Sequence, residues 1–323
     1  MHSIEQLQAL INKAINDTQY TEQPVELYEP ISYLMELGGK RMRPVLVLVS
    51  TELFGGQVLK ALDAAIGIEI FHNFTLMHDD IMDKAPIRRG KPTVHVKWNE
   101  SAAILSGDVM FVEAYKLMIK VEDNILRDVL AIFSETASGV CQGQQADMNF
   151  ENRNDVSLAE YLEMIRQKTA VLLAGSMQIG ALIGGAAQDQ AKLLYEFGQN
   201  LGLAFQLQDD ILDVYGDPEK FGKQVGGDIL SNKKTFMLIK AKELAKGNIA
   251  NELIQWIETS NNPTAKVEAI TNIYNQLEVR KLATFLMEDY VNKALHALDQ
   301  IAVEAGKKEL LKGFAEQLLI REQ

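Results

Sequence analysis

Cysteine is nearly absent from the sequence, because Cys141 is the only one among 323 residues. A single cysteine cannot form an internal disulfide, and such low use is typical of a reducing compartment, so we expect a cytoplasmic protein. No histidine or basic residue stands beside Cys141 in the sequence to stabilise a thiolate. We therefore expect this side chain to be inert and to lie in the core.

Positive charge is in the minority, with 32 Lys and Arg against 44 Asp and Glu and a formal net charge of −12 at pH 7. A polyanionic protein gains nothing from a second polyanion, so neither nucleic acid nor an anionic membrane is expected as a partner. Long apolar runs are also scarce. The longest, residues 170–187, has Ser176 and Gln178 at its centre. It is borderline in length for a bilayer, so we expect a buried helix and no membrane span.

Proline is missing from the middle of the chain, since five of the seven lie before residue 93 and none lies between residues 93 and 217. Long helices are therefore possible there. The run VLVLV at residues 45–49 could be a strand or begin a buried helix. No low-complexity linker divides the chain. We predict one all-helical domain over residues 1–323, with an amphipathic helix at its start and loops near residues 20–30, 84–97, 216–228 and 260–264.

Two clusters of aspartate stand out in the chain. LMHDDIMD (residues 76–83) and QLQDDILD (residues 206–213) carry Asp79, Asp80 and Asp83, and Asp209, Asp210 and Asp213. On a helix, residues at i, i+1 and i+4 point into an arc of about 100°, which would leave Ile81 and Ile211 facing the core. A solvated acidic surface is the ordinary explanation for one such cluster, but it explains two poorly.

Carboxylates this close together repel one another unless a cation lies between them. The donors are hard oxygens, with no cysteine or paired histidine to suit zinc or copper, and the spacing is not that of a calcium-binding loop. Magnesium fits, because it takes one or two carboxylates and completes its shell with water and substrate phosphate. The sequence therefore predicts magnesium and a polyphosphate substrate, with these candidate ligands: Asp79, Asp80, Asp83, Asp209 and Asp213.

Basic residues gather at five places in this acidic protein. They are Lys40, Arg41 and Arg43 in GGKRMRP, Arg88 and Arg89, Lys168, Lys223, and Lys233 with Lys234. Any one of these places could be ordinary solvated surface. Three of them, however, lie in loops marked by glycine or proline, near or within an Asp cluster, where the backbone could close over an anion. Together they supply more charge than one diphosphate needs, which suggests two phosphorylated substrates.

In these motifs the sequence resembles the polyprenyl synthetase family, the trans-isoprenyl diphosphate synthases. The matching segments follow the family's order: GGKRMRP (38–44), HNFTLMHDDIMDKAPIRRGKPTVH (72–95), GD (107–108), GQQADM (143–148), KTA (168–170) and FQLQDDILDVYGDPEKFGKQVGGDILSNKKT (205–235). The resemblance implies an all-α isoprenoid synthase fold. In that fold a bundle of long helices surrounds a deep central cavity, and the two Asp clusters face each other across its mouth. It also implies a homodimer.

The resemblance further implies a magnesium-dependent prenyltransferase with three metal ions per active site. An allylic diphosphate would be held through Asp79, Asp83, Asp209, Arg88, Lys168, Gln206, Lys223 and Lys233. Isopentenyl diphosphate would bind a separate basic site made of Lys40, Arg43, His72 and Arg89. Thr169 and Gln206 would direct oxygen dipoles at the allylic cation. His72 has an alternative role as a hydrogen-bonded core histidine.

Two aromatic residues precede the first aspartate on its predicted helix. Phe74 and Phe71 would lie roughly 7.5 Å and 12 Å along the helix from Asp79. Both rings could form a floor that stops a growing chain, whereas Thr75 is too small to block much; the alternative is ordinary core packing. By resemblance, an aromatic residue five positions before the first motif marks short-chain enzymes. The bacterial farnesyl type has two extra residues inside this motif, which DDIMD lacks, so we expect a C20 product rather than C15.

Two other functions are compatible with parts of this pattern. A terpene cyclase of the same fold would also ionise an allylic diphosphate, but it needs no second diphosphate site, and GGKRMRP with Arg89 argues against it. A non-catalytic partner subunit of a prenyl synthase could lose an Asp cluster or Lys40 without penalty, yet every piece is present here.

Overall fold

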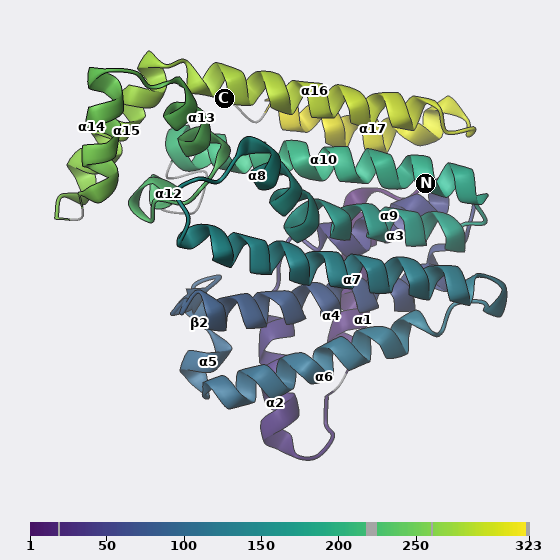
Figure 1. Cartoon of the computed structure of the whole chain (residues 1–323). Helices are drawn as coiled ribbons and strands as arrows, with labels where there is room; N and C mark the ends of the chain where they lie inside the picture. The colour runs from purple at the N-terminus through teal and green to yellow at the C-terminus, as the bar shows by residue number, and fades with distance from the viewer. Residues whose placement is uncertain (19, 218–224, 260, 321–323) are drawn as a thin grey trace. The chain divides into compact units, whose positions relative to one another are not determined.

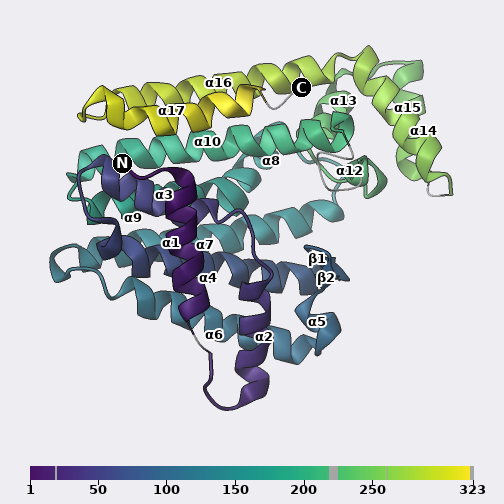
Figure 2. The same ribbon diagram turned by 180° about the vertical axis from the view of Figure 1, so that it is seen from behind.

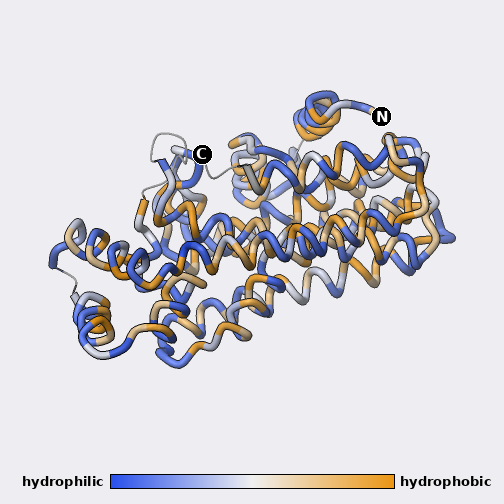
Figure 3. The backbone as a smooth tube through the Cα atoms, turned by 90° about the horizontal axis from the view of Figure 1, so that it is seen from above, coloured by the Kyte–Doolittle hydropathy of each residue, from blue (hydrophilic) through white to orange (hydrophobic). Residues whose placement is uncertain are grey.

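The computed structural model describes residues 1–18, 20–217, 225–259 and 261–320. These residues are almost wholly helical (Figure 1), as the sequence predicts. The strands they contain are β1 (Ile87–Arg88) and β2 (Lys91–Pro92), a short antiparallel hairpin. Figure 3 shows hydrophobic and hydrophilic residues alternating along the helices, as expected where each helix buries one face.

The chain divides into two compact units. Unit 1 comprises Met1–Glu135 and Gly175–Leu194, and unit 2 comprises Thr136–Ala174 and Tyr195–Gln323. Each unit contains fully buried apolar side chains of its own, such as Ile68 in unit 1 and Phe197 in unit 2. The single domain over residues 1–323 stays a prediction.

Unit 1 is built on the long helix that carries the first Asp cluster. Its helices are α1 (Ile4–Asp17), α2 (Val25–Glu36), α3 (Met42–Leu53), α4 (Val58–Met82), α5 (Val94–Lys97) and α6 (Glu100–Met118). Helices α4 and α6 pack along each other, and α3 packs on α4 (Figures 1 and 2). The motif GD at 107–108 serves this packing, because a Cβ on Gly107 would lie 2.2 Å from Nε2 of His78 on α4.

Three helices have residues in both units: α7 (Asp123–Glu151), α9 (Val171–Ile183) and α10 (Gln188–Tyr215). Unit 2 also contains α8 (Leu158–Ile165), η1 (Arg166–Ala170), α12 (Gly227–Leu230), α13 (Phe236–Leu244), α14 (Asn248–Glu258), α15 (Pro263–Gln276), α16 (Val279–Asp299) and α17 (Ala305–Ile320). The element η1 is a single π-helical turn, and such turns often mark functional sites. It contains the KTA motif.

Several local predictions are confirmed. The N-terminal helix α1 buries Leu7, Ile11 and Ile15. The ambiguous run at residues 45–49 lies inside helix α3 and is buried. Most of the longest apolar run forms helix α9. In the described part of the chain, every helix is too short or too polar to cross a bilayer.

Other local predictions are wrong. The loop near residues 20–30 is shorter than expected, because α2 begins at Val25 and continues through Pro30, whose ring is buried. The segment 84–97 is not wholly loop, since it contains the β1–β2 hairpin and α5. Cys141 is exposed. Its neighbours Val140 and Gln144 lie on the buried side of α7, and Cys141 falls outside that stripe.

Candidate active site

The first Asp cluster lies at the C-terminal end of α4. Asp79 is partly exposed, and Asp83 is the exposed C-cap residue, whose N–H donates to the carbonyl of Asp79 at 2.8 Å. Carboxylates at a helix C-terminus face the negative end of the helix dipole as well as one another. The position therefore favours a bound cation.

Asp80 differs from the other two aspartates, because it is buried. Arg88 donates to it twice, from Nε to Oδ2 at 2.7 Å and from Nη2 to Oδ1 at 2.8 Å. The chain folds back after α4, and the N–H of Ala85 donates to the Asp80 carbonyl at 2.9 Å. The expected single arc of three exposed carboxylates over a buried Ile81 is therefore wrong, since Asp80 turns inward and Ile81 is partly exposed.

The donors available at this helix end suit magnesium. No three His, Cys, Asp or Glu side chains converge on a metal position among the residues that the structure describes. Magnesium does not require such a cage, since it binds through one or two carboxylates and takes water and phosphate oxygens for the rest. Asp79 and Asp83 can supply those carboxylates.

The second Asp cluster lies at the C-terminal end of α10, in unit 2. Asp210 is buried there and accepts hydrogen bonds from the hydroxyl of Tyr161 and from the N–H of Phe236, the latter at 3.1 Å. Burial raises the pKa of Asp210 to about 7, while the hydrogen bond from Tyr161 acts in the opposite direction. Ile211 is buried, as predicted.

The remaining aspartates of this cluster, Asp209 and Asp213, are partly exposed. Asp213 accepts from the backbone N–H of Asp228 at 3.0 Å, and the N–H of Gly226 donates to its carbonyl at 2.6 Å. These bonds tie the end of α10 to the start of α12. Lys223, a predicted phosphate-binding residue, lies outside the described residues.

The π-helical turn η1 presents two predicted residues in unit 2. Lys168 forms an ion pair with Asp147 of GQQADM, with 2.6 Å between Nζ and Oδ2. Thr169 Oγ1 donates to Gln206 Oε1 at 3.3 Å. A Cβ on Gly143 would lie 2.2 Å from the backbone nitrogen of Lys168, so glycine is needed where α7 touches η1.

Unit 2 therefore brings Lys168, Thr169 and Gln206 close to one another, and Gln206 Nε2 donates to Asp210 Oδ1 at 3.4 Å. Lys233 is exposed after α12, and its positive charge acts to lower the pKa of Asp210. Asp147 and Tyr161 were missed as candidate residues. Asp147 belongs to a quoted motif, whereas nothing near Tyr161 in the sequence signals its bond to Asp210.

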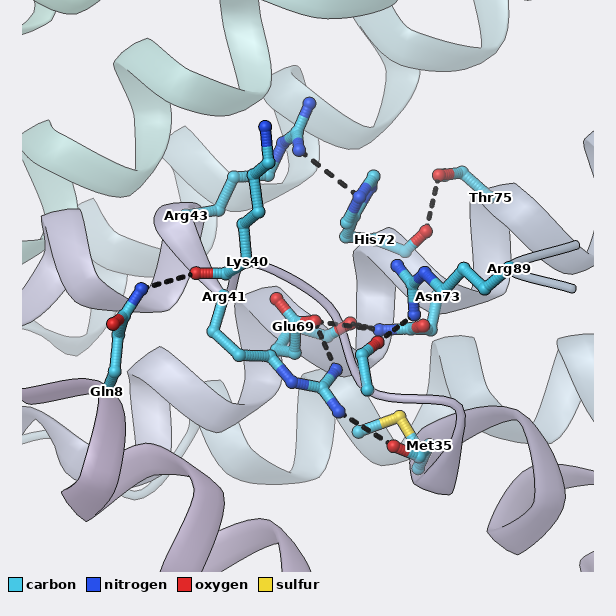
Figure 4. Close-up of polar contacts among 11 residues, drawn as sticks. Gln8, Met35, Lys40, Arg41, Arg43, Glu69, His72, Asn73, Thr75 and Arg89 are labelled. Atoms are coloured by element: carbon cyan, nitrogen blue, oxygen red, sulfur yellow. Dashed lines mark hydrogen bonds and ion pairs between the residues drawn. The ribbon is translucent and has the colours of Figure 1, made fainter. Parts of the chain in front are cut away.

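The four residues predicted to bind isopentenyl diphosphate come together in unit 1 (Figure 4). Arg43 Nη1 lies 3.2 Å from His72 Nε2. Arg89 donates to the carbonyl of Gly38. A Cβ on Gly39 would lie 3.0 Å from Arg89 Nη2, so the glycine pair lets this guanidinium approach the turn.

Burial and the neighbouring arginines together set the protonation state of His72. Burial lowers the pKa of His72 well below its ordinary value, and Arg43 and Arg89 lower it further by charge repulsion. The ring is therefore neutral near pH 7, and one ring nitrogen can accept a hydrogen bond from Arg43. This geometry is compatible with both roles predicted for His72.

Arg41 does not join this set. Its side chain is buried and pairs with Glu69, with 2.5 Å between Nη1 and Oε1. Its place in GGKRMRP predicts a cation available to substrate, and this prediction is wrong for Arg41. Glu69 was not among the predicted residues. A signal for Glu69 exists, because it is a lone acid in the apolar stretch IGIEIF of α4.

The predicted product-length residues belong to a cluster of rings in unit 1. Phe71 is fully buried against Phe133, with ring centroids 5.3 Å apart. Phe74 stacks on Phe111 at 5.1 Å with ring planes 12° apart. Thr75 donates from Oγ1 to the carbonyl of His72 at 2.7 Å, so its hydroxyl is already used within α4. Both rings therefore lie in one aromatic cluster along α4, and their role as a floor stays a prediction.

Comparisons with known proteins cover the whole chain. A family model described as polyprenyl synthetase matches residues 24–277. The geranylgeranyl diphosphate synthase of Methanosarcina mazei is 38% identical over 314 residues, which cover 97% of this chain and 95% of that protein. The enzyme of the same name from Sulfolobus acidocaldarius is 40% identical over 283 residues, or 86% and 85% of the two chains. A crystal structure of a geranylgeranyl pyrophosphate synthase has a TM-score of 0.95 and 42% identity over 100% of both chains.

Proposed function

This chain belongs to the polyprenyl synthetase family, and we propose on that premise that it condenses isopentenyl diphosphate with an allylic diphosphate, head to tail and in trans, to form geranylgeranyl diphosphate. The names of the relatives support a short-chain product, and C20 over C15. So do the short first motif and the aromatic residue five positions before it.

The observation that carries the proposal is the excess of cations in unit 1. Arg43 contacts a neutral His72, Arg89 is close enough to lower the pKa of that ring, and Lys40 extends from the same turn as Arg43. The nearby carboxylate of Glu69 is already paired with Arg41. Repulsion between these cations is relieved when an anion binds among them. A synthase needs such a second diphosphate site, whereas a cyclase does not.

We assign the carboxylates to metal and the oxygen dipoles to the cation. Asp79 and Asp83 in the first cluster, and Asp209 and Asp213 in the second, would hold magnesium, with three ions per active site. Bound magnesium would neutralise charge on the leaving diphosphate, so that the allylic C–O bond ionises. Asp80 also stays a predicted ligand, although both of its oxygens are bonded to Arg88.

The side chains of the protein would bind and orient the two substrates. The allylic diphosphate would accept hydrogen bonds from Arg88, Lys168 and Lys233. The hydrogen bond from Thr169 holds the side-chain oxygen of Gln206 in a fixed orientation. The double bond of isopentenyl diphosphate attacks the allylic cation, and the proton then lost passes to the departing diphosphate. No protein base is required.

A product assay tests this function. The purified protein is incubated with magnesium, labelled isopentenyl diphosphate and each of the C5, C10 and C15 allylic diphosphates in turn, and the dephosphorylated products are separated by chromatography. We expect a C20 alcohol only when both substrates are present. A hydrocarbon released from the allylic substrate alone would indicate a cyclase. No product from any starter would indicate a non-catalytic subunit.

We also propose that the protein is a cytoplasmic homodimer. Support comes from one face of α6 and its C-cap residue, where Leu105, Val112 and Ile119 recur every seven residues and are 56%, 53% and 52% exposed. An apolar stripe of this kind is unusual on a monomer and suits a second copy of the chain. Leu105→Glu should shift the mass measured by light scattering from that of a dimer to that of a monomer, and the same change at exposed Lys60 should not.

A further inference from the structure

A buried ion pair lies close to the predicted isopentenyl diphosphate site of Lys40, Arg43, His72 and Arg89. Arg41 is 4% exposed and Glu69 is 2% exposed. Arg41 donates from Nη1 to Glu69 and from Nη2 to the carbonyl of Met35 at 2.7 Å. A charge enclosed in this way cannot reach a substrate, so Arg41 has a different task from its neighbours.

The pair anchors a turn with an uncommon backbone. Gly38, Gly39 and Arg41 all have positive φ, at 75°, 146° and 50°. A left-handed conformation is unfavourable for an arginine and persists only where surrounding contacts impose it. The contacts of Arg41 join this turn to Met35 in α2 and Glu69 in α4.

Helix α4 holds the same turn at a second point. His72 lies three residues after Glu69, on the same face of the helix, and contacts Arg43. Asn73, one residue further on, donates to Glu69 Oε1 at 3.0 Å and fixes the carboxylate. A third support comes from Gln8 of α1, which donates to the carbonyl of Lys40 at 2.9 Å.

The alternation of side chains along the turn explains what this anchoring achieves. Figure 4 shows Lys40 and Arg43 extending to one side of the turn and Arg41 extending to the other, toward Glu69 and Met35. Two cations that point the same way repel each other, and their long side chains have many rotamers. A fixed backbone keeps both side chains within reach of a single anion.

We propose that the Arg41–Glu69 pair is a positioning element for the isopentenyl diphosphate site. It locks the turn at residues 38–43 in register with His72, so that Lys40 and Arg43 bind one diphosphate together. The inference rests on the proposed function. Neither Arg41 nor Glu69 touches the substrate, and both act through their neighbours.

The test removes the pair and measures each substrate separately. In the double variant Arg41→Met with Glu69→Leu, both charges disappear together, which avoids stranding one of them in the core. We expect the KM for isopentenyl diphosphate to rise about 10-fold or more, because a small misplacement of binding groups is costly. The KM for the allylic diphosphate should stay within about twofold of the wild-type value, since the pair does not support that site.

A matched control separates positioning from loss of stability. Ile68→Ala removes a buried side chain from the same helix, one residue from Glu69, without touching the pair. It should lower the melting temperature and leave both KM values unchanged. The inference is overturned if the double variant keeps the wild-type KM for isopentenyl diphosphate, if both KM values rise together, or if Ile68→Ala reproduces the selective effect.

A binding measurement keeps this test independent of turnover. Isopentenyl diphosphate without magnesium should raise the melting temperature of the wild-type protein, and the shift should be lost in the double variant. Glu69→Gln, which keeps the shape of the side chain and removes its charge, replaces the double variant if that does not fold. If the wild type is active and isopentenyl diphosphate raises the melting temperature of the wild type and the variants equally, the positioning role is refuted and the proposed function is not. A wild type that makes no product refutes the proposed function, and absence of any wild-type shift also overturns the inference.

Discussion

Asp80 and Asp210, the second aspartates of the two clusters, are both 3% exposed, and each is held by a side chain of its own unit. Arg88 binds Asp80 through two hydrogen bonds, and Tyr161 donates its hydroxyl to Asp210. The two clusters therefore share one arrangement. In each, the second aspartate is buried and hydrogen-bonded within its unit, and the other two are partly or fully exposed. This arrangement predicts different consequences for the same substitution at adjacent positions.

Asp79→Asn should fold normally and lose most turnover, because it removes a proposed metal ligand while relieving repulsion in the metal-free protein. Its melting temperature should hold or rise. Asp209→Asn should behave in the same way. Steady-state assays at saturating magnesium and thermal unfolding check both variants. Asp63→Asn, at an exposed position on α4, is the control and should leave activity unchanged. Near-normal turnover in either cluster variant would contradict the metal assignment.

Asp80→Asn should instead lose stability. The change leaves the guanidinium of Arg88 without its charged partner in a largely buried position. A hydrogen bond to a charged group contributes about 1.5–3 kcal/mol. Since Arg88 keeps some solvent contact, we expect a loss of about 1–2 kcal/mol in the free energy of unfolding, measured by denaturant titration. A stability equal to that of Asp79→Asn would show that the inward bond matters little.

Lys40→Ala and Arg88→Ala should divide the two substrates between them. Lys40 belongs to the turn beside His72, so its loss should raise the KM for isopentenyl diphosphate more than that for the allylic substrate. Arg88 lies at the first Asp cluster, so its loss should do the reverse. Initial rates with each substrate varied in turn give both constants, and Lys60→Ala, an exposed position on α4, is the control. If both variants weakened the same substrate, the two-site assignment would be wrong.

His72 should make the protein less stable as the pH falls. Its pKa in the folded protein lies well below 6.5, so below pH 6.5 the unfolded chain takes up a proton that the folded protein does not. This loss begins near pH 6.5 and continues until the pH reaches the folded pKa. At pH 5.5 the wild type should lose about 1 kcal/mol relative to His72→Gln. Urea titrations of both proteins at pH 7.5 and pH 5.5 measure the difference.

The sequence predicts the helices well because their signals are local. The absence of proline leaves room for the long helices α7 and α10, and the amphipathic start marks α1. The run at residues 45–49 was ambiguous for a physical reason, since an apolar stretch buried on all sides has no periodicity to show. Pro30 led to the wrong prediction of a loop, because burial of its ring compensates for the backbone hydrogen bond that a proline cannot make in a helix.

The parts of the site that the sequence did not reveal depend on contacts between distant residues. Asp80 turns inward because the hairpin after α4 returns Arg88 to it. Arg41 is not available to bind substrate, because its side chain pairs with Glu69, which lies 28 residues later in the sequence. Charge and spacing indicate which residue types gather in a region. They do not indicate which cation is used by the fold and which by the ligand.

Product length offers the last test, because Phe74 and Phe71 have either a blocking or a packing role. Phe74 stacks on Phe111 of α6, so removing its ring opens space next to α4 without removing the whole cluster. Phe74→Ala should shift the main product beyond C20 if the chain grows along this helix. Phe71→Ala should act further along, and the double variant should give the longest products. Separation of dephosphorylated products by chromatography measures each distribution.

Stability must be separated from product length in this series. Loss of a buried phenylalanine costs about 3–5 kcal/mol, which is enough to lower activity on its own. Leu7→Ala in α1 removes another fully buried side chain of unit 1 and serves as the control. It should lower the melting temperature and keep the wild-type product distribution, since Leu7 belongs to α1 and is not a member of the ring cluster. A wild-type product well beyond C20, or an unchanged distribution in the double variant, would assign both rings to core packing alone.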